Sequence, residues 1–356
     1  MGKNDRAFLQ SVQSRFDSFL ENIPSGGRVG ILCHNDVDGL TSGAILGRSL
    51  SAAGYPVSVL TTGKAQSAWS PAIAEQVAGF DPAAVIVTDF SPRSAELIPG
   101  VPTLVIDHHR PEGPALQAGL ITGYGHDPTP TAGLLTYWAS QVLDRGTALR
   151  WLAALSILGD LAESAEFPEL EEERVIYGQQ LLREATVLLN APRRSSTGDA
   201  RPALDLLLKA NNPREITESK HPEVAELKRA RREVQEALQQ AKMAAPKFSG
   251  QVALVLIDTP CQVHPIMAQI WKSRLQKYIV ICANTGYRPA YVHFSVRSAT
   301  NVNLLDFLRD CAPLDAGENY GGGHDQATGG FLRVPVWNQF LQRLGFSEDV
   351  MVSIES

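Results

Sequence analysis

The chain has 356 residues, of which 44% are hydrophobic, and its formal net charge is −6. This length favours two domains with sizeable cores, and the negative charge argues against a protein that coats long duplex DNA electrostatically. The charge does not exclude binding of a single phosphate group, because bound divalent cations would reverse the local sign.

Strand-like and helix-like stretches alternate through the first part of the chain. A helix with one apolar face is predicted over 5–23, and residues 29–33 form the first strand-like apolar run. The alternation continues with a helix from about 40 to 54, a strand at 57–60, a helix at 71–78, and strands at 85–87 and 103–106. This order predicts an α/β fold built on a parallel sheet.

Helical patterns follow, and then the composition changes. Helices are predicted over 132–143, 148–162 and 169–189. The stretch 193–199, rich in Arg and Ser, is a plausible edge of the first domain. Residues 223–245 form a long charged helix. Its basic residues could contact nucleic acid, but a solvated linker helix with i,i+4 charge pairs explains them better.

The α/β pattern restarts after residue 250. Strands are predicted at 252–257, 278–282 and 291–296, and helices at 265–275, 304–311 and 335–344, with a glycine-rich loop before the last helix. We therefore expect three parts: a catalytic parallel-sheet domain over 1–192, a helical linker over 193–247, and a smaller α/β substrate-binding domain over 248–356.

The sequence carries no sign of secretion or membrane insertion. No apolar run approaches the roughly 20 residues needed to cross a bilayer, and the polar N-terminus lacks a signal-peptide core. Cys33 and Cys282 lie in strand-like apolar runs, and no C-x-x-C spacing occurs. We expect a cytoplasmic protein without a membrane partner, whose oligomeric state the sequence leaves open.

Acidic and imidazole side chains follow three strands of the predicted first sheet. Because the carboxyl ends of parallel strands share one edge of the sheet, these groups would meet there. They would repel one another unless cations lay between them. An ordinary polar turn explains one aspartate, but not three possible ligands in five residues. The side chains are His34, Asp36 and Asp38 after the first strand, Asp89 after 85–87, and Asp107, His108 and His109 after 103–106.

Two further residues, Asp160 and His126, carry weaker signals, and Asp107 has a second possible role. Asp160 ends a very apolar helix, where an unpaired carboxylate is unusual, and this favours a role as a ligand. Asp107 could orient one of the neighbouring imidazoles instead of binding metal. His126 has no comparable neighbours and is a less favoured candidate for lining the site.

Two motifs of the second domain suggest phosphate binding. Gly321, Gly322 and Gly323 precede His324, and three glycines let the backbone approach a ligand closely. Arg297, at the end of a predicted strand, could bind a phosphate through two N–H groups. The alternative is a glycine-rich surface turn and a rim arginine, and the glycine motif alone does not decide between them.

Taken in order, these residues resemble the DHH phosphoesterase superfamily, in particular its RecJ-like and nanoRNase-like branch with a C-terminal DHH-associated domain. His34-x-Asp36-x-Asp38-Gly39 resembles the first motif, Asp89 the second, Asp107-His108-His109 the third and Gly159-Asp160 the fourth. In the second domain, Gly321-Gly322-Gly323-His324 and Ser295-x-Arg297-Ser298 resemble the motifs of the DHH-associated domain.

The resemblance implies a site for two Mn²⁺ ions, with Mg²⁺ or Co²⁺ as alternatives. By position, His34, Asp36 and Asp89 would hold one ion, and Asp38, Asp89, His108 and Asp160 the other. His109 and Asp107 would be the catalytic residues beside the scissile phosphate. The implied substrate contacts are Arg297, Ser298, Gly321, Gly322, Gly323 and His324.

Three functions stay open. The favoured one is a manganese-dependent phosphodiesterase or exonuclease that hydrolyses single-stranded or short oligonucleotides to mononucleotides with two metals. The second is a phosphatase or phosphodiesterase for 3′-phosphoadenosine 5′-phosphate or dinucleotides. The third is a scaffold that lacks activity, which the complete set of ligand positions disfavours. Full RecJ nucleases carry further domains, and we expect no OB-fold after this second domain. Cleavage polarity and the choice between RNA and DNA are undetermined.

Overall fold

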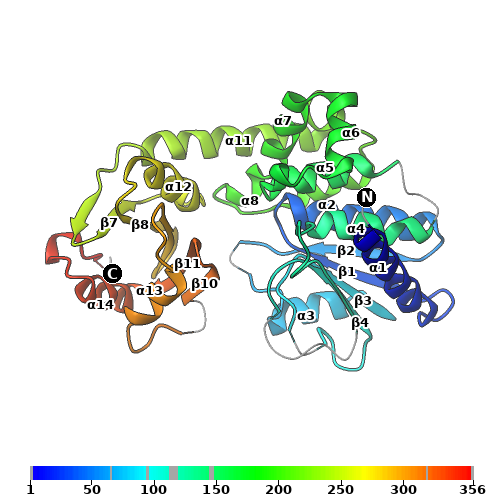
Figure 1. Cartoon of the computed structure of the whole chain (residues 1–356), viewed down its shortest axis with the longest axis horizontal. Coiled ribbons are helices and arrows are strands. Elements are labelled where there is room, and N and C mark those ends of the chain that lie inside the picture. Colours follow the sequence, from blue (N-terminus) through cyan, green and yellow to red (C-terminus); the bar gives the residue numbers. More distant parts are fainter. Residues whose placement is uncertain are drawn as a thin grey trace. The chain divides into compact units, whose positions relative to one another are not determined.

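The computed structural model describes residues 3–64, 66–93, 96–111, 119–143, 148–317 and 320–353, with only the backbone at 3–5 and 323–324 (Figure 1). The chain forms two compact units. The first comprises Met1–Arg193 and Gly198–Arg229, and the second comprises Arg194–Thr197 and Ala230–Ser356. Among the described residues no helix combines the length and the apolar character needed to span a membrane.

The first unit contains a five-stranded sheet in which all strands are parallel. The predicted α/β architecture is therefore confirmed. Strands β1, β3 and β4 are buried along their whole length, as expected for a sheet that is covered on both faces. The strands are β1 (Val29–Cys33), β2 (Val57–Thr61), β3 (Ala84–Thr88), β4 (Thr103–Asp107) and β5 (Gly119–Thr122), in the order β2-β1-β3-β4-β5.

Helices cover both faces of this sheet. On one face, Phe16 of α1 (Lys3–Glu21) and Leu46 of α2 (Val37–Ala52) pack with Ile31 of β1, together with α4 (Ala132–Ser140). On the other face, Ile73 of α3 (Pro71–Ala78) packs with Leu32 of β1. Alternate residues of one strand therefore serve two cores.

The rest of the first unit is helical and shares one apolar core with α2 and α4. The predicted helix over 169–189 is divided at Gly178, whose φ of 80° ends α6 and begins α7. The elements are η1 (Gln141–Leu143), α5 (Arg150–Gly159), η2 (Ala162–Ala165), α6 (Pro168–Tyr177), α7 (Gln179–Leu189), α8 (Ala191–Arg194), α9 (Arg201–Lys209) and α10 (Pro213–Thr217).

The structure divides the chain differently from the expected linker over 193–247. Residues 198–229 belong to the first unit, because Leu204 and Leu207 of α9 and Ile216 of α10 are buried in its core. The charged helix α11 (Pro222–Ala241) continues from the first unit into the second.

The second unit is built on a six-stranded sheet in which only β7 and β8 pair in parallel. Helices α13 and α14 pack on one face around Phe294 and Trp337, and α12 packs on the other around Met267 and Cys282. The strands are β6 (Lys247–Ser249), β7 (Val252–Ile257), β8 (Ile279–Arg288), β9 (Tyr291–Ser298), β10 (Tyr320–His324) and β11 (Ala327–Arg333), in the order β10-β11-β9-β8-β7-β6. The helices are α12 (His264–Arg274), α13 (Leu304–Asp310), α14 (Val334–Arg343) and η3 (Glu348–Val350).

Candidate metal centre

Four segments of the first unit bring acidic and imidazole side chains to the carboxyl edge of its sheet. Asp36 is the N-cap of α2 after β1, Asp89 follows β3, and His108 follows β4. Asp160 is the C-cap of α5. Because β1, β3 and β4 are adjacent and parallel, their ends lie side by side. All six predicted ligands meet in what we call the carboxylate cluster: His34, Asp36, Asp38, Asp89, His108 and Asp160.

Asp89 lies between two groups of this cluster. Its Oδ2 is 3.3 Å from Nδ1 of His34, which is 3.0 Å from Oδ2 of Asp36. Its Oδ1 is 3.6 Å from Nε2 of His108. A carboxylate whose two oxygens face different groups can bridge two cations. The backbone φ of Asp89 is 62°, a conformation that aspartate and asparagine adopt more readily than most residues.

His108 provides the test of whether the site suits a cation. Its Nε2 is 3.1 Å from Oδ2 of Asp160, 3.6 Å from Oδ2 of Asp38 and 3.6 Å from Oδ1 of Asp89. This nitrogen is nevertheless buried and makes no hydrogen bond with the residues that the structure describes. A buried imidazole nitrogen among three carboxylate oxygens, with no hydrogen bond of good geometry, fits a metal ligand.

Asp38 is fully buried and is held by two helices. Its Oδ1 accepts hydrogen bonds from the backbone N–H of Gly133 at 2.7 Å and from the hydroxyl of Ser156 at 2.6 Å. Its Oδ2 accepts one from the N–H of Ala132 at 2.9 Å. The N-terminus of α4 and the side chain of α5 therefore orient this carboxylate, and the positive end of the α4 dipole favours its charge.

Asp107 orients His109 and does not join the six clustered ligands. Its Oδ1 is 2.8 Å from Nδ1 of His109, and its Oδ2 accepts a hydrogen bond of 2.7 Å from the N–H of the same residue. The carboxylate only accepts, so Nδ1 of His109 carries the proton. The expectation that Asp107 positions an imidazole agrees with this geometry.

Burial and the charges of the carboxylate cluster shift the pKa values of its histidine and aspartate side chains. Burial is the largest influence on the pKa of His34 and lowers it, but the surrounding carboxylates raise the pKa to about 10. Burial also lowers the pKa of His108, and the carboxylates again prevail and raise it to about 12. Burial raises the pKa of Asp38 and of Asp89, and repulsion from neighbouring carboxylates adds to this. Without cations the cluster therefore retains protons, and cations are the natural replacement.

Two residues near the cluster escaped the sequence reasoning. Nη1 of Arg193 is 3.9 Å from Oδ2 of Asp36, and no local pattern around Arg193 indicates this approach. Ser156 precedes Asp160 by four residues in α5, and this i,i+4 spacing, which places both on one helix face, was an available signal. His126, a less favoured candidate, lines a different pocket of the same unit.

In the second unit the structure brings only some of the predicted substrate contacts together. Arg297 donates from Nη1 to the carbonyl oxygens of Val296 at 2.9 Å and Thr328 at 3.1 Å. Ser298 is fully buried, and its hydroxyl bonds with that of Thr300 at 2.8 Å. Successive strand residues point to opposite faces, so Ser298 is turned away from Arg297.

The predicted glycine-rich loop is a strand, β10, which pairs antiparallel with β11. Gly321 has φ of 81°, and the pairing shifts register between Tyr320 and Gly322. A Cβ at Gly322 would meet nothing within 4 Å, so this part of the strand is open. The side chain of His324 lies outside the described part of the structure.

Imidazole and aromatic rings also lie beside Arg297, a feature that sequence reasoning missed. His293 and Arg297 are four residues apart in β9, so their side chains lie on the same face of the strand. The ring of His293 stacks on that of Phe331, with centroids 4.9 Å apart. Burial is the main influence on His264, at the start of α12, and lowers its pKa to about 3. These rings come from separate strands and a helix, so no single sequence motif indicates that they lie together.

Comparison with known proteins identifies solved structures that share this fold. No protein-family model matches the sequence, and no curated protein matches it significantly. The structure is similar to an exonuclease RecJ bound to manganese (TM-score 0.66, 21% identity, 94% of this chain and 93% of the other). It is also similar to RecJ in complex with Mn²⁺ from Thermus thermophilus (0.69, 19%, 94% and 54%).

A third similar structure is the DHH domain of a protein described as belonging to a family of ribosomal proteins (TM-score 0.68, 14% identity, 97% of this chain and 92% of the other). These likenesses extend over both units and confirm, at the level of the fold, the resemblance read from the motifs. The chain therefore shares the fold of these two RecJ structures and of this DHH domain.

Proposed function

We propose that the protein is a divalent-metal-dependent phosphodiesterase that releases mononucleotides from single-stranded or short oligonucleotides. The observation that carries this proposal is the position of Asp89, whose two carboxylate oxygens face two separate groups of ligands. The fold shared with a RecJ exonuclease bound to manganese supports it. The mixture of imidazole and carboxylate donors suits manganese better than magnesium.

Each residue of the cluster has a part in this proposal. Two cations, when bound, supply a water-derived nucleophile at neutral pH and neutralise charge on the phosphate. The proposed holders of one ion are His34, Asp36 and Asp89, and those of the other are Asp38, Asp89, His108 and Asp160.

His109 is proposed to act on the substrate. Burial, the largest single influence, lowers its pKa, but the hydrogen bond to Asp107 together with the charges of Asp107 and Asp89 raises the pKa overall. When protonated, the ring would keep one N–H on Asp107 and present the other to a phosphate oxygen. Asp107 then serves catalysis by fixing the orientation of the ring.

In the second unit, Arg297 and the open glycine strand β10 are the proposed contacts for a phosphate or a terminal nucleotide. Ser298 is left out because its hydroxyl is buried and bonded, and His324 stays a prediction from the sequence. The buried thiols of Cys33 and Cys282 agree with the proposed cytoplasmic location.

The first test removes the bridging carboxylate. Asp89→Asn keeps the size of the side chain and tolerates the φ of 62°, so loss of activity would not reflect a strained backbone. We expect at least a hundredfold loss of manganese-dependent mononucleotide release from an end-labelled oligonucleotide. Asp205→Asn, at an exposed position of α9, is the control and should retain full activity. Undiminished release by Asp89→Asn would refute the proposal.

A length series identifies the substrate class. Rates with manganese would be measured on 3′-phosphoadenosine 5′-phosphate, a dinucleotide, and single strands of increasing length in both sugars. The proposal expects turnover to extend beyond the dinucleotide. Turnover of the smallest substrates alone would favour the small-nucleotide phosphodiesterase, and stoichiometric manganese without turnover of any of them would favour the inactive scaffold.

A further inference from the structure

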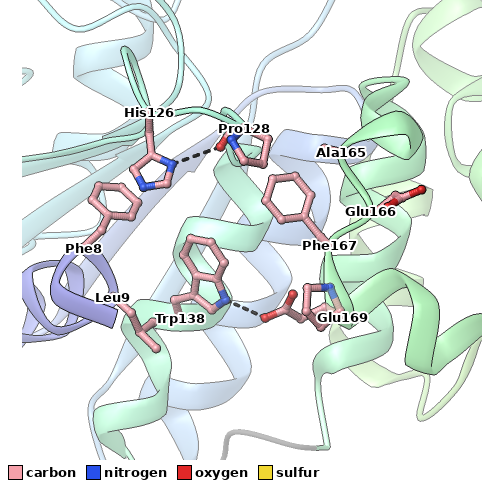
Figure 2. A pocket seen from close by; sticks show the side chains of 10 residues that line it. Phe8, Leu9, His126, Pro128, Trp138, Ala165, Glu166, Phe167 and Glu169 are labelled. Carbon is pink, nitrogen blue, oxygen red and sulfur yellow. Dashed lines mark hydrogen bonds between the residues drawn. The ribbon is translucent and has the colours of Figure 1, made fainter. Parts of the chain in front are cut away.

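A second pocket of the first unit shares no residue with the carboxylate cluster (Figure 2). It has a volume of about 270 Å³ and lies between α1, the loop before α4, α4 itself and the segment from η2 into α6. Pockets for drug-sized ligands have volumes of roughly 300–1,000 Å³, so this one suits a smaller molecule.

Four of the residues that line this pocket carry aromatic rings. Phe8 and His126 are stacked, with centroids 4.2 Å apart and an interplanar angle of 27°. Trp138 stands edge-on to Phe8 at 6.3 Å and to Phe167 at 6.4 Å. Figure 2 shows these four rings around one central space. Because aromatic rings favour offset-stacked and edge-to-face contacts with other rings, the wall suits a flat ring.

Glu169 places one polar group in this apolar wall. Its Oε1 accepts a hydrogen bond of 2.7 Å from Nε1 of Trp138 (Figure 2). Its Oε2 is buried and makes no hydrogen bond with the residues that the structure describes. A buried acceptor without a donor is unfavourable. An N–H group of a bound molecule would satisfy it after a small rotation of the carboxylate toward the pocket, because Oε2 itself has almost no accessible surface.

We propose that this pocket binds a small planar heteroaromatic amine, of the chemical class of an aminopurine or aminopyrimidine base. The ring lies among Phe8, Trp138 and Phe167, and its amino group donates to Oε2 of Glu169. Because Oε2 has no donor among the described residues, the carboxylate favours a ring that carries an amino group over a ring that lacks one. The site is independent of the proposed phosphodiesterase activity, since none of its residues belongs to the carboxylate cluster.

Two matched probes test this selectivity. 9-Methyladenine has its amino group as the sole N–H donor, and 9-methylpurine has the same ring without any. Calorimetric titration of the manganese-loaded full chain should show one adenine site and binding of 9-methylpurine weaker by roughly tenfold or more. Equal affinities, or no binding of 9-methyladenine at millimolar concentration, would overturn the proposal.

Variants locate the probe. In Glu169→Gln the amide oxygen takes the bond from Trp138 and its NH₂ group faces the ligand, so the preference for 9-methyladenine should disappear. Glu171→Gln, an exposed carboxylate of the same helix, should keep the preference. Ala165→Phe adds a ring to the pocket wall without removing a contact, and it should abolish binding of both probes.

Binding that survives Ala165→Phe, or an unchanged preference in Glu169→Gln, would contradict this location. Asp89→Asn must bind 9-methyladenine as tightly as the original chain, because the pocket does not use the cluster. Lost binding in that variant would place the probe at the carboxylate cluster and overturn the inference. Since the readout is binding, its outcome is separate from that of the nuclease test.

Discussion

The hydroxyl of Ser156 donates a hydrogen bond of 2.6 Å to Oδ1 of Asp38, and both groups are buried. The same oxygen accepts a bond from the N–H of Gly133. These partners lie 118 and 95 residues after Asp38 in the chain. Oδ1 thus has two donors, and Oδ2 is the oxygen that faces His108. Two helices far along the sequence determine which atom of Asp38 is presented to a cation.

Ser156→Ala should weaken manganese binding by roughly 10–100-fold, because groups that orient a ligand typically contribute this much to metal affinity. The affinity is measured by calorimetry or by paramagnetic resonance of free Mn²⁺, apart from any activity assay. Ser140→Ala is the matched control, since this buried hydroxyl of α4 donates only to the carbonyl of Tyr137 among the described residues. Equal affinity in both variants would show that Ser156 has no orienting role.

Gly133→Ala should destabilise the first unit by about 1–3 kcal/mol, the usual range for overpacking a core. A Cβ at Gly133 would lie 2.5 Å from Cβ and 2.6 Å from Oγ of Ser156, so α4 must move away from Asp38. Urea denaturation measures the change. The double variant Gly133→Ala with Ser156→Gly removes the two nearest clashing atoms, leaves Oγ1 of Thr41 at 2.9 Å, and should recover part of the loss. A single variant as stable as the original chain would contradict this packing.

Manganese binding should release protons. Without cations the pKa values of His34 and His108 are about 10 and about 12, so both rings are protonated at pH 7.5. Metal ligation requires the neutral imidazole, and each ring therefore gives up one proton on binding. The apparent affinity must accordingly rise with pH.

Calorimetry in buffers of different ionisation enthalpy counts these protons. We expect one proton from each of the two rings, and His34→Gln should release one fewer than the original chain. Binding of the metal without net proton release at pH 7.5 would show that the rings are not ligands.

His264 should make the second unit less stable in acid. Burial depresses its pKa to about 3, whereas an unfolded histidine titrates near 6.5. Between these values the unfolded chain binds a proton that the folded chain does not, so stability is full above about pH 6.5 and falls as the pH is lowered. From pH 7 to pH 5 the loss is about 2 kcal/mol.

Chemical denaturation of the original chain and of His264→Gln at both pH values isolates this contribution, because all other titrating groups are shared. The variant should lose about 2 kcal/mol less than the original chain over the same interval. Identical losses in the two proteins would mean that His264 is protonated in the folded state.

Local patterns were sufficient to predict the parallel sheet and the six clustered side chains. The clustered side chains lie at or shortly after the end of an apolar strand or helix, as Asp89 follows β3 and Asp160 ends α5. The edge of a parallel sheet then brings the strand ends together without any information about side-chain packing. Other strands were missed where this signal is weak. β5 has four residues and begins with a glycine, and β10 consists largely of glycine, which has low strand propensity.

The amino-acid sequence by itself determined which chemical groups are present. It also determined which strand or helix end carries each group, because strand and helix ends depend on residues that are close in sequence. Only the tertiary structure decided that Ser156 and Gly133 hold Asp38, that Ser298 is turned away from Arg297, and that Phe8 and Glu169 border one pocket. These relations join segments far apart in the chain. They depend on how helices pack against one another, and no local periodicity encodes that packing.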